Sequence, residues 1–375
     1  MEEINKLILA VIPNQRCNLK CEYCYISQVE DWDDNDTMKY SPEHIAACLS
    51  KERLGGTALI NLTGNGETML QSNIVDIIRC LLQEGHYVEV VTNGTVRKKF
   101  EEIVAFPNEL LDRLFFKLSF HYKELNRLGV LDRFYETVTL LKNNNIAYSL
   151  ELMAYDGIEN DIDAIVNSCV DNVGAICQST IGRADRKKGR DLLSVHSQAE
   201  YETIWSKLNS PMLKFKLQLL GVKRREFCYA GKWSLLVDLY TGNAKACYRQ
   251  PYSQNIFEDI QKPIDFCPVG HYCLQPYCIN GHAHLTWGLI PELNTPSYLE
   301  MRNRKCLDGT EWISNSCHSF FQTKLYESNK EYSKEQKVIH TVIYPFKYVK
   351  SLLWNPTLNI GRLGKFIKIW HKTEE

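Results

Sequence analysis

The chain lacks three features that would direct it to a membrane, out of the cell or to nucleic acid. Nowhere in its 375 residues do about 18 apolar residues run together, which excludes a helix that spans a bilayer. Its N-terminus has no basic segment followed by a long apolar one, which excludes a secretory signal. The formal net charge is only −1, which gives no overall charge footprint for nucleic acid. We therefore expect a cytoplasmic protein that binds no nucleic acid.

The 14 cysteines need an explanation other than disulfide bonds. Disulfides persist in oxidising compartments, whereas a chain without a secretory signal is expected to stay in a reducing one. The composition is otherwise globular, with 44% hydrophobic and 24% charged residues, and the length suffices for one large domain and a smaller one. Most of the thiols are thus expected to serve another purpose.

Three cysteines lie close together near the start, in the stretch Arg-Cys-Asn-Leu-Lys-Cys-Glu-Tyr-Cys-Tyr. Cys17, Cys21 and Cys24 are spaced C-x3-C-x2-C, so that one loop can turn their sulfurs toward one point. Thiolates on such a loop select zinc or an iron–sulfur cluster. A structural zinc site normally has four ligands, and no Cys or His follows Cys24 closely. A 4Fe–4S cluster on three thiolates keeps one iron open; the alternatives are a structural metal knuckle or a chance group of buried cysteines.

Strands and helices alternate over about the first 210 residues. Short apolar runs predict strands, and the segments between them predict helices. The strands are expected at 5–12, 58–62, 87–91, 114–120, 147–153 and 173–179, and the helices after Ser41-Pro42 and at 72–84, 132–142, 161–170 and 197–208. Six strand–helix units predict an α/β fold with a parallel sheet and right-handed crossovers. The spacing fits both a flat doubly wound sheet and an incomplete barrel.

The three-cysteine motif, with Tyr25 directly after Cys24, resembles the signature of the radical S-adenosylmethionine (SAM) superfamily. The resemblance implies a catalytic 4Fe–4S cluster on Cys17, Cys21 and Cys24, whose open iron chelates SAM. In that family one electron from the cluster cleaves SAM to a 5′-deoxyadenosyl radical, which abstracts a hydrogen atom from a carbon. It further implies a flavodoxin- or ferredoxin-type reductant and a partial (β/α)6 TIM-like barrel with the cluster at its C-terminal mouth.

The loop after the second strand, Gly64-Asn65-Gly66-Glu67, resembles the Gly-x-Gly-Glu form of a motif in this family. Glycines let the backbone approach a bound amino acid closely, and a carboxylate accepts hydrogen bonds from an ammonium group. The resemblance implies that Asn65, Gly66 and Glu67 bind the methionine part of SAM. It also implies that Tyr25 helps to place the adenine through its backbone.

Three further residues lie at the ends of predicted strands. Ser119 and His121, at the end of the fourth strand, match positions where the family contacts the ribose or the methionine of SAM. The alternative is that both only satisfy the end of a strand. Cys177 lies on the predicted sixth strand, where a thiol facing the barrel interior could donate a hydrogen atom to a substrate radical. Core packing is the alternative for this residue, and Cys48, Cys80 and Cys169 in helical stretches are predicted to be buried apolar groups.

A second group of cysteines begins beyond residue 210. Cys228 and Cys247 are separated by 13 residues, Gly242 and four more, which resembles the C-x(9–15)-G-x4-C opening of the SPASM and twitch auxiliary domains. A hairpin around Thr241-Gly242-Asn243 would bring the two thiols to the same end. Five more cysteines follow: Cys267, Cys273, Cys278, Cys306 and Cys317. They lack the first cysteine of the complete SPASM run C-x2-C-x5-C-x3-C and lengthen its last interval.

The resemblance implies at least one auxiliary 4Fe–4S cluster, held by Cys228, Cys247 and members of the group Cys267, Cys273 and Cys278. The alternative is a zinc site, for which three histidines are available: His271, His282 and His284. The last segment, 338–372, mixes aromatic and basic residues and is broken by Pro356 and Gly361. We expect short helices there that cap the domain, with contact to a membrane surface as the second interpretation.

Together these features predict a radical SAM barrel at 1–212, an auxiliary iron–sulfur domain at 213–300 and a helical C-terminal extension at 301–375. The resemblance implies an oxidoreductase- or epimerase-type enzyme that acts on a carbohydrate or another small molecule. Peptide maturases of this architecture often carry a leader-binding domain before the barrel, and the first strand begins so early that we expect none here. Modification of a ribosomal peptide or protein is the first alternative, and a scaffold or electron carrier without catalysis is the second.

Overall fold

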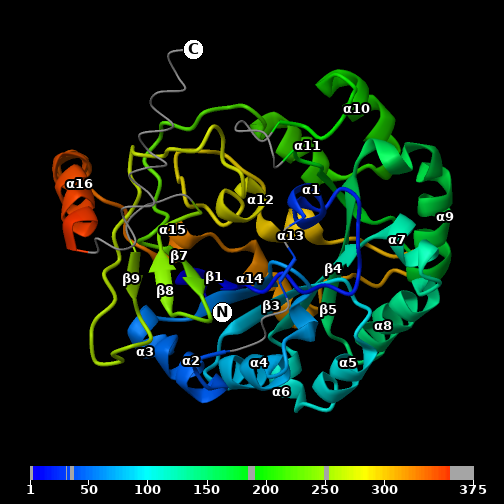
Figure 1. Ribbon diagram of the computed structural model, residues 1–375, viewed down its shortest axis with the longest axis horizontal. Helices are drawn as coiled ribbons and strands as arrows, with labels where there is room; N and C mark the ends of the chain where they lie inside the picture. The colour runs from blue at the N-terminus through cyan, green and yellow to red at the C-terminus, as the bar shows by residue number, and fades with distance from the viewer. Residues whose placement is uncertain (1–2, 31, 34–37, 185–190, 249–252, 355–375) are drawn as a thin grey trace.

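A nine-stranded sheet of order β6-β5-β4-β3-β2-β1-β7-β8-β9 forms the centre of the protein (Figure 1). The computed structural model describes residues 3–30, 32–33, 38–184, 191–248 and 253–354, except for the side chains of Val29 and 347–354. Six strands come from the first half: β1 (Lys6–Ile12), β2 (Ala58–Gly64), β3 (Tyr87–Thr92), β4 (Leu114–Phe120), β5 (Ala147–Ala154) and β6 (Gln178–Ile181). Each pairs in parallel with the next. This confirms the predicted partial barrel of six parallel strands.

Helices alternate with these strands, and most of them pack on the outer face of the sheet (Figure 1). They are α1 (Tyr25–Val29), α2 (Pro42–Cys48), α3 (Lys51–Leu54), α4 (Ile74–Gln83), α5 (Arg97–Ile103), α6 (Asn108–Leu111), α7 (Tyr122–Arg127), α8 (Leu131–Asn143), α9 (Ile162–Val173), α10 (Gln198–Trp205) and α11 (Pro211–Leu219), with 3-10 turns at Thr68–Leu70, Asp156–Asp161 and Ser206–Leu208. Helix α2 begins as the sequence predicts, because the Ser41 side chain accepts a hydrogen bond from His44 N at 3.2 Å and Pro42 occupies the first turn.

The segment after residue 220 continues the barrel sheet. Strand β7 (Ser234–Asp238) pairs in parallel with β1, and β8 (Asn243–Lys245) and β9 (Ser253–Asn255) follow in antiparallel order. The predicted hairpin around Gly242 is confirmed, whereas its attachment to β1 had no signal in the sequence. The remaining helices are α12 (Gly281–His284), α13 (Tyr298–Arg302), α14 (Asn315–Gln322), α15 (Leu325–Ser328) and α16 (Lys334–Trp354).

Helices α12 to α14 cover the inner face of the barrel sheet. Phe320 on α14 stacks on Tyr87 of β3 with ring centroids 3.7 Å apart, and Phe321 meets Phe115 of β4 edge-on at 5.1 Å. These rings belong to one buried core with Leu7 and neighbouring apolar side chains at the N-terminal end of the strands. The core forms an apolar floor, above which the inner faces of the strands turn polar.

Two elements differ from the sequence prediction. Strand β6 begins at Gln178 rather than at 173, because α9 runs to Val173 and Gly174, with φ of +84°, ends it. The tail is helical up to Trp354 in a single helix that contains Pro345, and the remainder of the tail lies outside the described residues. Among the described residues, no helix has both the length and the apolar character to cross a bilayer.

Candidate functional site

The loop between β1 and α1 carries the three-cysteine motif at the C-terminal end of the strands. Cys17, Cys21 and Cys24 line a cavity of about 220 Å³. The loop after β2 and the ends of β3, β4 and β5 provide the other walls. The cavity brings together all the residues that the sequence assigns to the catalytic cluster and to SAM: Cys17, Cys21, Cys24, Tyr25, Asn65, Gly66, Glu67, Ser119 and His121.

The three thiols have the chemistry of ligands to a cationic metal group. Burial raises the pKa of Cys17 to about 11 and the pKa of Cys21 further, so both are neutral unless a positive charge is bound beside them. Sulfurs around a tetrahedral zinc lie about 3.8 Å apart. Within the described residues, no three cysteine sulfurs all lie within 4.8 Å of one another. The three sulfurs are therefore not spaced as ligands of one tetrahedral zinc ion, and three thiolates are the donors that an iron–sulfur cluster takes.

The loop after β2 is joined to the three-cysteine loop through the backbone. Gly66 N donates to Asn14 O and Glu67 N donates to Arg16 O, each at 2.8 Å. A Cβ at position 66 would lie 2.0 Å from Arg16 O, so no side chain fits between the two loops. Tyr25 Oη closes the contact by donating to Asn65 O at 2.5 Å. Glycine at position 66 therefore sets the distance between the three-cysteine loop and the predicted SAM-binding loop.

The Glu67 carboxylate is buried and already accepts three hydrogen bonds. Its Oε1 accepts from Met69 N at 2.9 Å and from Thr92 Oγ1 at 2.5 Å, while Oε2 accepts from Asn93 N at 2.7 Å. Burial raises the pKa of Glu67, although these bonds oppose the rise. Of the acceptor positions on the carboxylate, one on Oε2 stays open for a ligand. Glu67 thus ties the β2 loop to the end of β3.

Residues that the sequence analysis did not single out hold the three-cysteine loop from its other side. Asn18 Nδ2 donates to Thr95 Oγ1 at 2.7 Å, and Asn93 Nδ2 donates to Asn18 Oδ1 at 2.8 Å. The sequence contained a signal for these residues. Thr92-Asn93-Gly94 ends a predicted strand, and the preceding strand ends in the Gly-Asn-Gly-Glu loop. Polar residues at neighbouring carboxyl ends of parallel strands are expected to meet.

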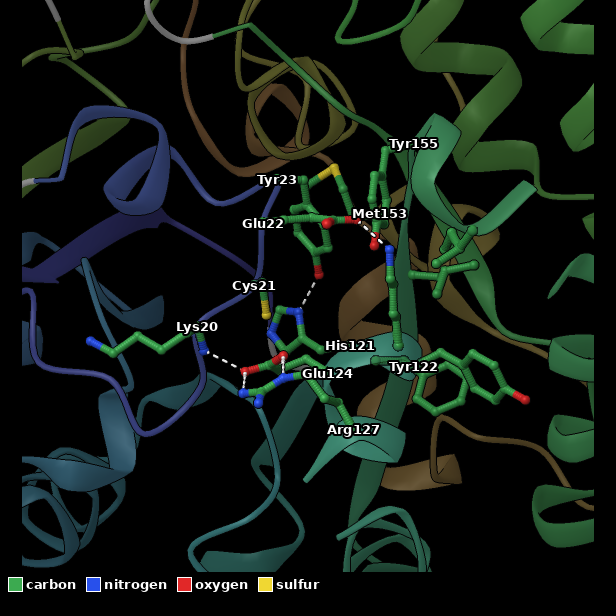
Figure 2. A pocket seen from close by; sticks show the side chains of 14 residues that line it. Lys20, Cys21, Glu22, Tyr23, His121, Tyr122, Glu124, Arg127, Met153 and Tyr155 are labelled. Carbon is green, nitrogen blue, oxygen red and sulfur yellow. Dashed lines mark hydrogen bonds and ion pairs between the residues drawn. The ribbon is translucent and has the colours of Figure 1, made fainter. Parts of the chain in front are cut away.

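Helix α7 supports the cysteine loop around a second cavity, of about 160 Å³, on the other side of Cys21 (Figure 2). Glu124 accepts from Lys20 N at 2.9 Å and is held by Arg127 at 2.8 Å. The Tyr23 hydroxyl and His121 Nδ1 share a hydrogen bond. Burial lowers the pKa of His121 to about 4, so the ring is neutral and its orientation is fixed by Tyr23.

Four of the five cysteines predicted to hold the auxiliary cluster are brought together. Cys228, Cys247, Cys273 and Cys278 line one cavity. Burial raises the pKa of Cys228, Cys247 and Cys278, that of Cys247 to about 12. Cys267 does not line that cavity, because its side chain turns toward α16, where its Sγ lies 3.8 Å from His340 Nε2. The structure thus places Cys267 apart from the other four predicted thiols, which line the cavity together.

The other cysteines and histidines of this region lie elsewhere. Cys306 Sγ donates to Val173 O at 3.4 Å and Cys317 Sγ to Asp112 O at 3.3 Å, and both thiols are buried. His271 shares a hydrogen bond with Arg225 O, and His282 faces the barrel interior. Of the three histidines considered as zinc ligands, His284 alone lines the four-cysteine cavity. The possible metal ligands around this cavity are thus four thiols and one histidine.

A polar cavity of about 180 Å³ lies inside the barrel, above the apolar floor. It is lined by Glu89 of β3 and Lys117 of β4, and from the covering helices by His282, Tyr298 and Arg302. Glu151 of β5 joins these charges, since its carboxylate lies 3.2 Å from Arg302 Nε and 3.6 Å from Lys117 Nζ.

Two acceptors in this cavity have no partner. Tyr298 Oη donates to Glu89 Oε2 at 2.5 Å, whereas Glu89 Oε1 and His282 Nδ1 make no hydrogen bond within the described part of the chain. Burial and the cations Lys216 and Lys117 lower the pKa of His282, so its ring is neutral. The sequence signal for this cavity was one charged residue in the middle of each of three apolar strands: Tyr-Val-Glu-Val-Val, Phe-Phe-Lys-Leu-Ser and Ser-Leu-Glu-Leu-Met.

Cys177 lies on the opposite side of the sheet from this cavity. Its thiol is fully buried in the core beneath the helices, where it shares a hydrogen bond with Cys169 of α9. The residue precedes β6 instead of lying on it, because that strand begins at Gln178. The expectation that Cys177 faces the interior as a hydrogen donor is therefore wrong, and the core-packing alternative describes it.

Comparison with known proteins gives consistent matches. The radical SAM superfamily matches residues 11–168. GTP 3′,8-cyclase of Clostridium perfringens (strain 13 / Type A) is 25% identical over 170 residues, which are 43% of this chain and 51% of that protein. The antilisterial bacteriocin subtilosin biosynthesis protein AlbA of Bacillus subtilis (strain 168) is 24% identical over 280 residues, 68% of this chain and 58% of that protein. The chain thus spans between half and three fifths of these relatives.

Among solved structures, the chain is similar to native anSMEcpe with bound AdoMet and Cp18Cys peptide. The superposition covers 92% of this chain and 99% of the anSMEcpe chain, with a TM-score of 0.49 and 14% sequence identity. The superfamily match contains the three-cysteine loop, the Gly-Asn-Gly-Glu loop and the strand ends that meet around the first cavity. Residues 11–168 thus form a radical SAM domain, and a domain of this superfamily binds a 4Fe–4S cluster and SAM.

Proposed function

We propose that this chain is an enzyme that oxidises a small polar molecule in its interior cavity, between the catalytic cluster and one auxiliary 4Fe–4S cluster. The observation that carries the proposal is the order of the three cavities. Val91 lines both the three-cysteine cavity and the interior cavity, whereas Tyr248 and Asn280 line both the interior cavity and the four-cysteine cavity. A molecule in the interior cavity therefore lies between the two cysteine groups.

Cys17, Cys21 and Cys24 would hold the catalytic cluster, and Cys228, Cys247, Cys273 and Cys278 would hold the auxiliary one. When bound, the catalytic cluster and SAM would supply hydrogen-atom abstraction on one side of the interior cavity, and the auxiliary cluster would supply an acceptor for one electron on the other. The β2 loop would orient the methionine part of SAM, with the open position on Glu67 Oε2 facing its ammonium group. Ser119, His121 and Tyr25 form the remaining walls of that cavity.

The interior cavity has the polar groups that a hydroxyl-rich molecule needs. Glu89 Oε1 and His282 Nδ1 are free acceptors, and Lys117 and Arg302 are cationic donors. Burying these charges costs several kcal/mol for each ion, a cost that a purely structural core would avoid with apolar side chains. A volume of about 180 Å³ accommodates a compact group of this kind. We therefore favour a carbohydrate or another small polar molecule.

Oxidation is favoured over epimerisation by the residues around the cavity. Oxidation of an alcohol carbon removes one hydrogen atom, then one electron and the proton of the hydroxyl group. Glu89 Oε1 has the free acceptor position to take that proton. Epimerisation instead needs a hydrogen-atom donor, and the described lining of the interior cavity contains no cysteine.

Modification of a peptide is the second candidate. Its support is the match with AlbA, whose name assigns it to the biosynthesis of a bacteriocin and which aligns with 68% of this chain. The polar interior cavity would then receive one side chain of the peptide. A cell extract separated into small molecules and peptides distinguishes the two candidates. The small-molecule fraction should stimulate SAM cleavage if the substrate is a small polar molecule, and the peptide fraction should do so if the substrate is a peptide.

Iron content tests the two cluster assignments. Anaerobically reconstituted protein is expected to bind about eight irons, and a Cys17/Cys21/Cys24→Ala variant about four, with no release of 5′-deoxyadenosine under dithionite. Cys278→Ala is expected to lose iron at the auxiliary site and keep SAM cleavage. Its matched control is Cys267→Ala, which should retain about eight irons because that thiol faces His340. Equal iron loss in the two single variants would contradict the auxiliary ligand set.

Deuterium transfer tests the substrate and the role of Glu89. Substrate from cells grown in heavy water should give deuterium-bearing 5′-deoxyadenosine, and a hydrazine reagent should capture the carbonyl product. In Glu89→Gln we expect deuterium transfer to persist and the carbonyl product to fall by about 100-fold, since the proton acceptor is gone. Glu101→Gln is the control, because that carboxylate lies on the exposed surface. Undiminished product in Glu89→Gln would exclude Glu89 as the base.

A further inference from the structure

As far as its side chains are described, up to Phe346, helix α16 packs on the rest of the protein with one of its sides. Lys337 Nζ lies 3.0 Å from Glu292 Oε1, and the Tyr344 ring stacks on Tyr272 with centroids 5.3 Å apart. His340 meets Phe227 edge-on at 5.4 Å. Figure 1 shows the helix at the edge of the molecule, beside the segment that carries the second cysteine group. The helix is therefore anchored through Lys337, His340 and Tyr344.

The other side of α16 is apolar and exposed. It consists of Val338, Ile339, Val342, Ile343 and Phe346, whose exposed fractions are 64%, 56%, 61%, 46% and 72%. The spacing of one, four, five and eight residues places all five on one continuous face of a helix. We call this set the apolar face of α16. Soluble proteins rarely leave so many neighbouring apolar side chains in water, and such a face is typical of an interaction site.

The sequence around the apolar face and beyond it is strongly basic. From 338 to 373 there is no Asp or Glu, although the whole chain has a formal net charge of −1. The basic residues of this stretch are Lys347, Lys350, Arg362, Lys365, Lys368 and Lys372. Trp354, Phe366 and Trp370 are interleaved with them. Positive charge is thus concentrated in the sequence that adjoins the apolar face of α16.

We propose that the apolar face of α16 binds the surface of an anionic lipid bilayer. The apolar face enters the boundary between headgroups and acyl chains, and the basic sequence that adjoins this face favours anionic headgroups. A bilayer accommodates both features at once. An acidic protein or a nucleic acid would use the charge and leave the five apolar side chains in water. The contact places the enzyme at a membrane surface.

Vesicle sedimentation with the reconstituted full-length protein tests the proposal. The protein should sediment with vesicles of an equal mixture of phosphatidylcholine and phosphatidylglycerol, and not with phosphatidylcholine alone. The variant Val338→Gln/Val342→Gln/Phe346→Gln should lower the bound-to-free ratio by about tenfold or more, because it removes apolar contact with the acyl chains. The control is Val195→Gln/Leu307→Gln, at two apolar residues that are 89% and 82% exposed elsewhere. It should bind as the unchanged protein does.

The results of this experiment show whether a bilayer or a second copy of the chain covers the apolar face of α16. Failure of the unchanged protein to sediment with anionic vesicles overturns the proposal, as does equal binding by the triple variant. A dimer in size-exclusion chromatography that the triple variant abolishes would assign the face to a second copy of the chain and also overturns it. Uncoupled release of 5′-deoxyadenosine should be the same in all three proteins, so this test does not depend on the proposed reaction.

Discussion

Gly66→Ala is expected to abolish the catalytic cluster while leaving the auxiliary one. A Cβ at this position would lie 2.0 Å from Arg16 O and 2.8 Å from the carbonyl carbon of Gln15, which are backbone atoms of the three-cysteine loop. The two loops must then separate, and the hydrogen bonds from Gly66 N to Asn14 O and from Glu67 N to Arg16 O are lost. Displaced thiols no longer converge on one cluster. We expect iron to fall from about eight to about four per chain and SAM cleavage to fall by at least about 100-fold.

The control for Gly66→Ala is Gly129→Ala, at the end of α7. No atom lies within 4 Å of a Cβ built there, although a φ of +64° makes alanine unfavourable by about 1 kcal/mol. Both variants therefore carry one methyl group more, and only one of them affects the contact between the loops. Iron analysis and dithionite-driven release of 5′-deoxyadenosine compare the two. Full iron content and normal cleavage in Gly66→Ala would show that the loop contact does not shape the cluster site.

The residues around the first cavity could be predicted because their signals are local. Cys17, Cys21 and Cys24 lie within one loop, and the Gly-Asn-Gly-Glu stretch follows a strand that the apolar pattern identifies. Parallel strands bring their carboxyl ends to one edge of the sheet, so the order of strands was sufficient to collect these residues with Ser119 and His121. Motif and topology together placed the site without any knowledge of side-chain packing.

The interior cavity could not be predicted in the same way, because half of it comes from helices far along the chain. Glu89 meets Tyr298 across 209 residues, and Glu151 meets Arg302. Cys267 and Cys273 likewise look equivalent in the sequence. Only the packing of α16, which brings His340 to Cys267, separates the first from the cluster ligands. Contacts of this kind have no periodic signal in the sequence.

Arg302→Met is expected to destabilise the protein by about 3 kcal/mol or more. Arg302 is fully buried on α13, with its guanidinium 3.8 Å from the centre of the Tyr298 ring and its Nε 3.2 Å from Glu151. Without it, the buried Glu151 carboxylate has Lys117 as its remaining ion-pair partner, at 3.6 Å. Urea unfolding of the reconstituted protein measures the change. Lys207→Met is the control, since its pair with Asp163 is exposed and should contribute less than about 1 kcal/mol.

A triple variant separates the structural role of these charges from a functional one. In Lys117→Met/Glu151→Leu/Arg302→Met all three charges are replaced by apolar groups of similar size, and such replacements are often neutral or stabilising. We expect the triple variant to regain most of the free energy of unfolding lost in Arg302→Met, and to release 5′-deoxyadenosine without forming the carbonyl product. A stable triple variant that still forms product would mean that the substrate does not depend on these charges. A triple variant no more stable than Arg302→Met would instead show that the ion pairs hold the covering helices in place.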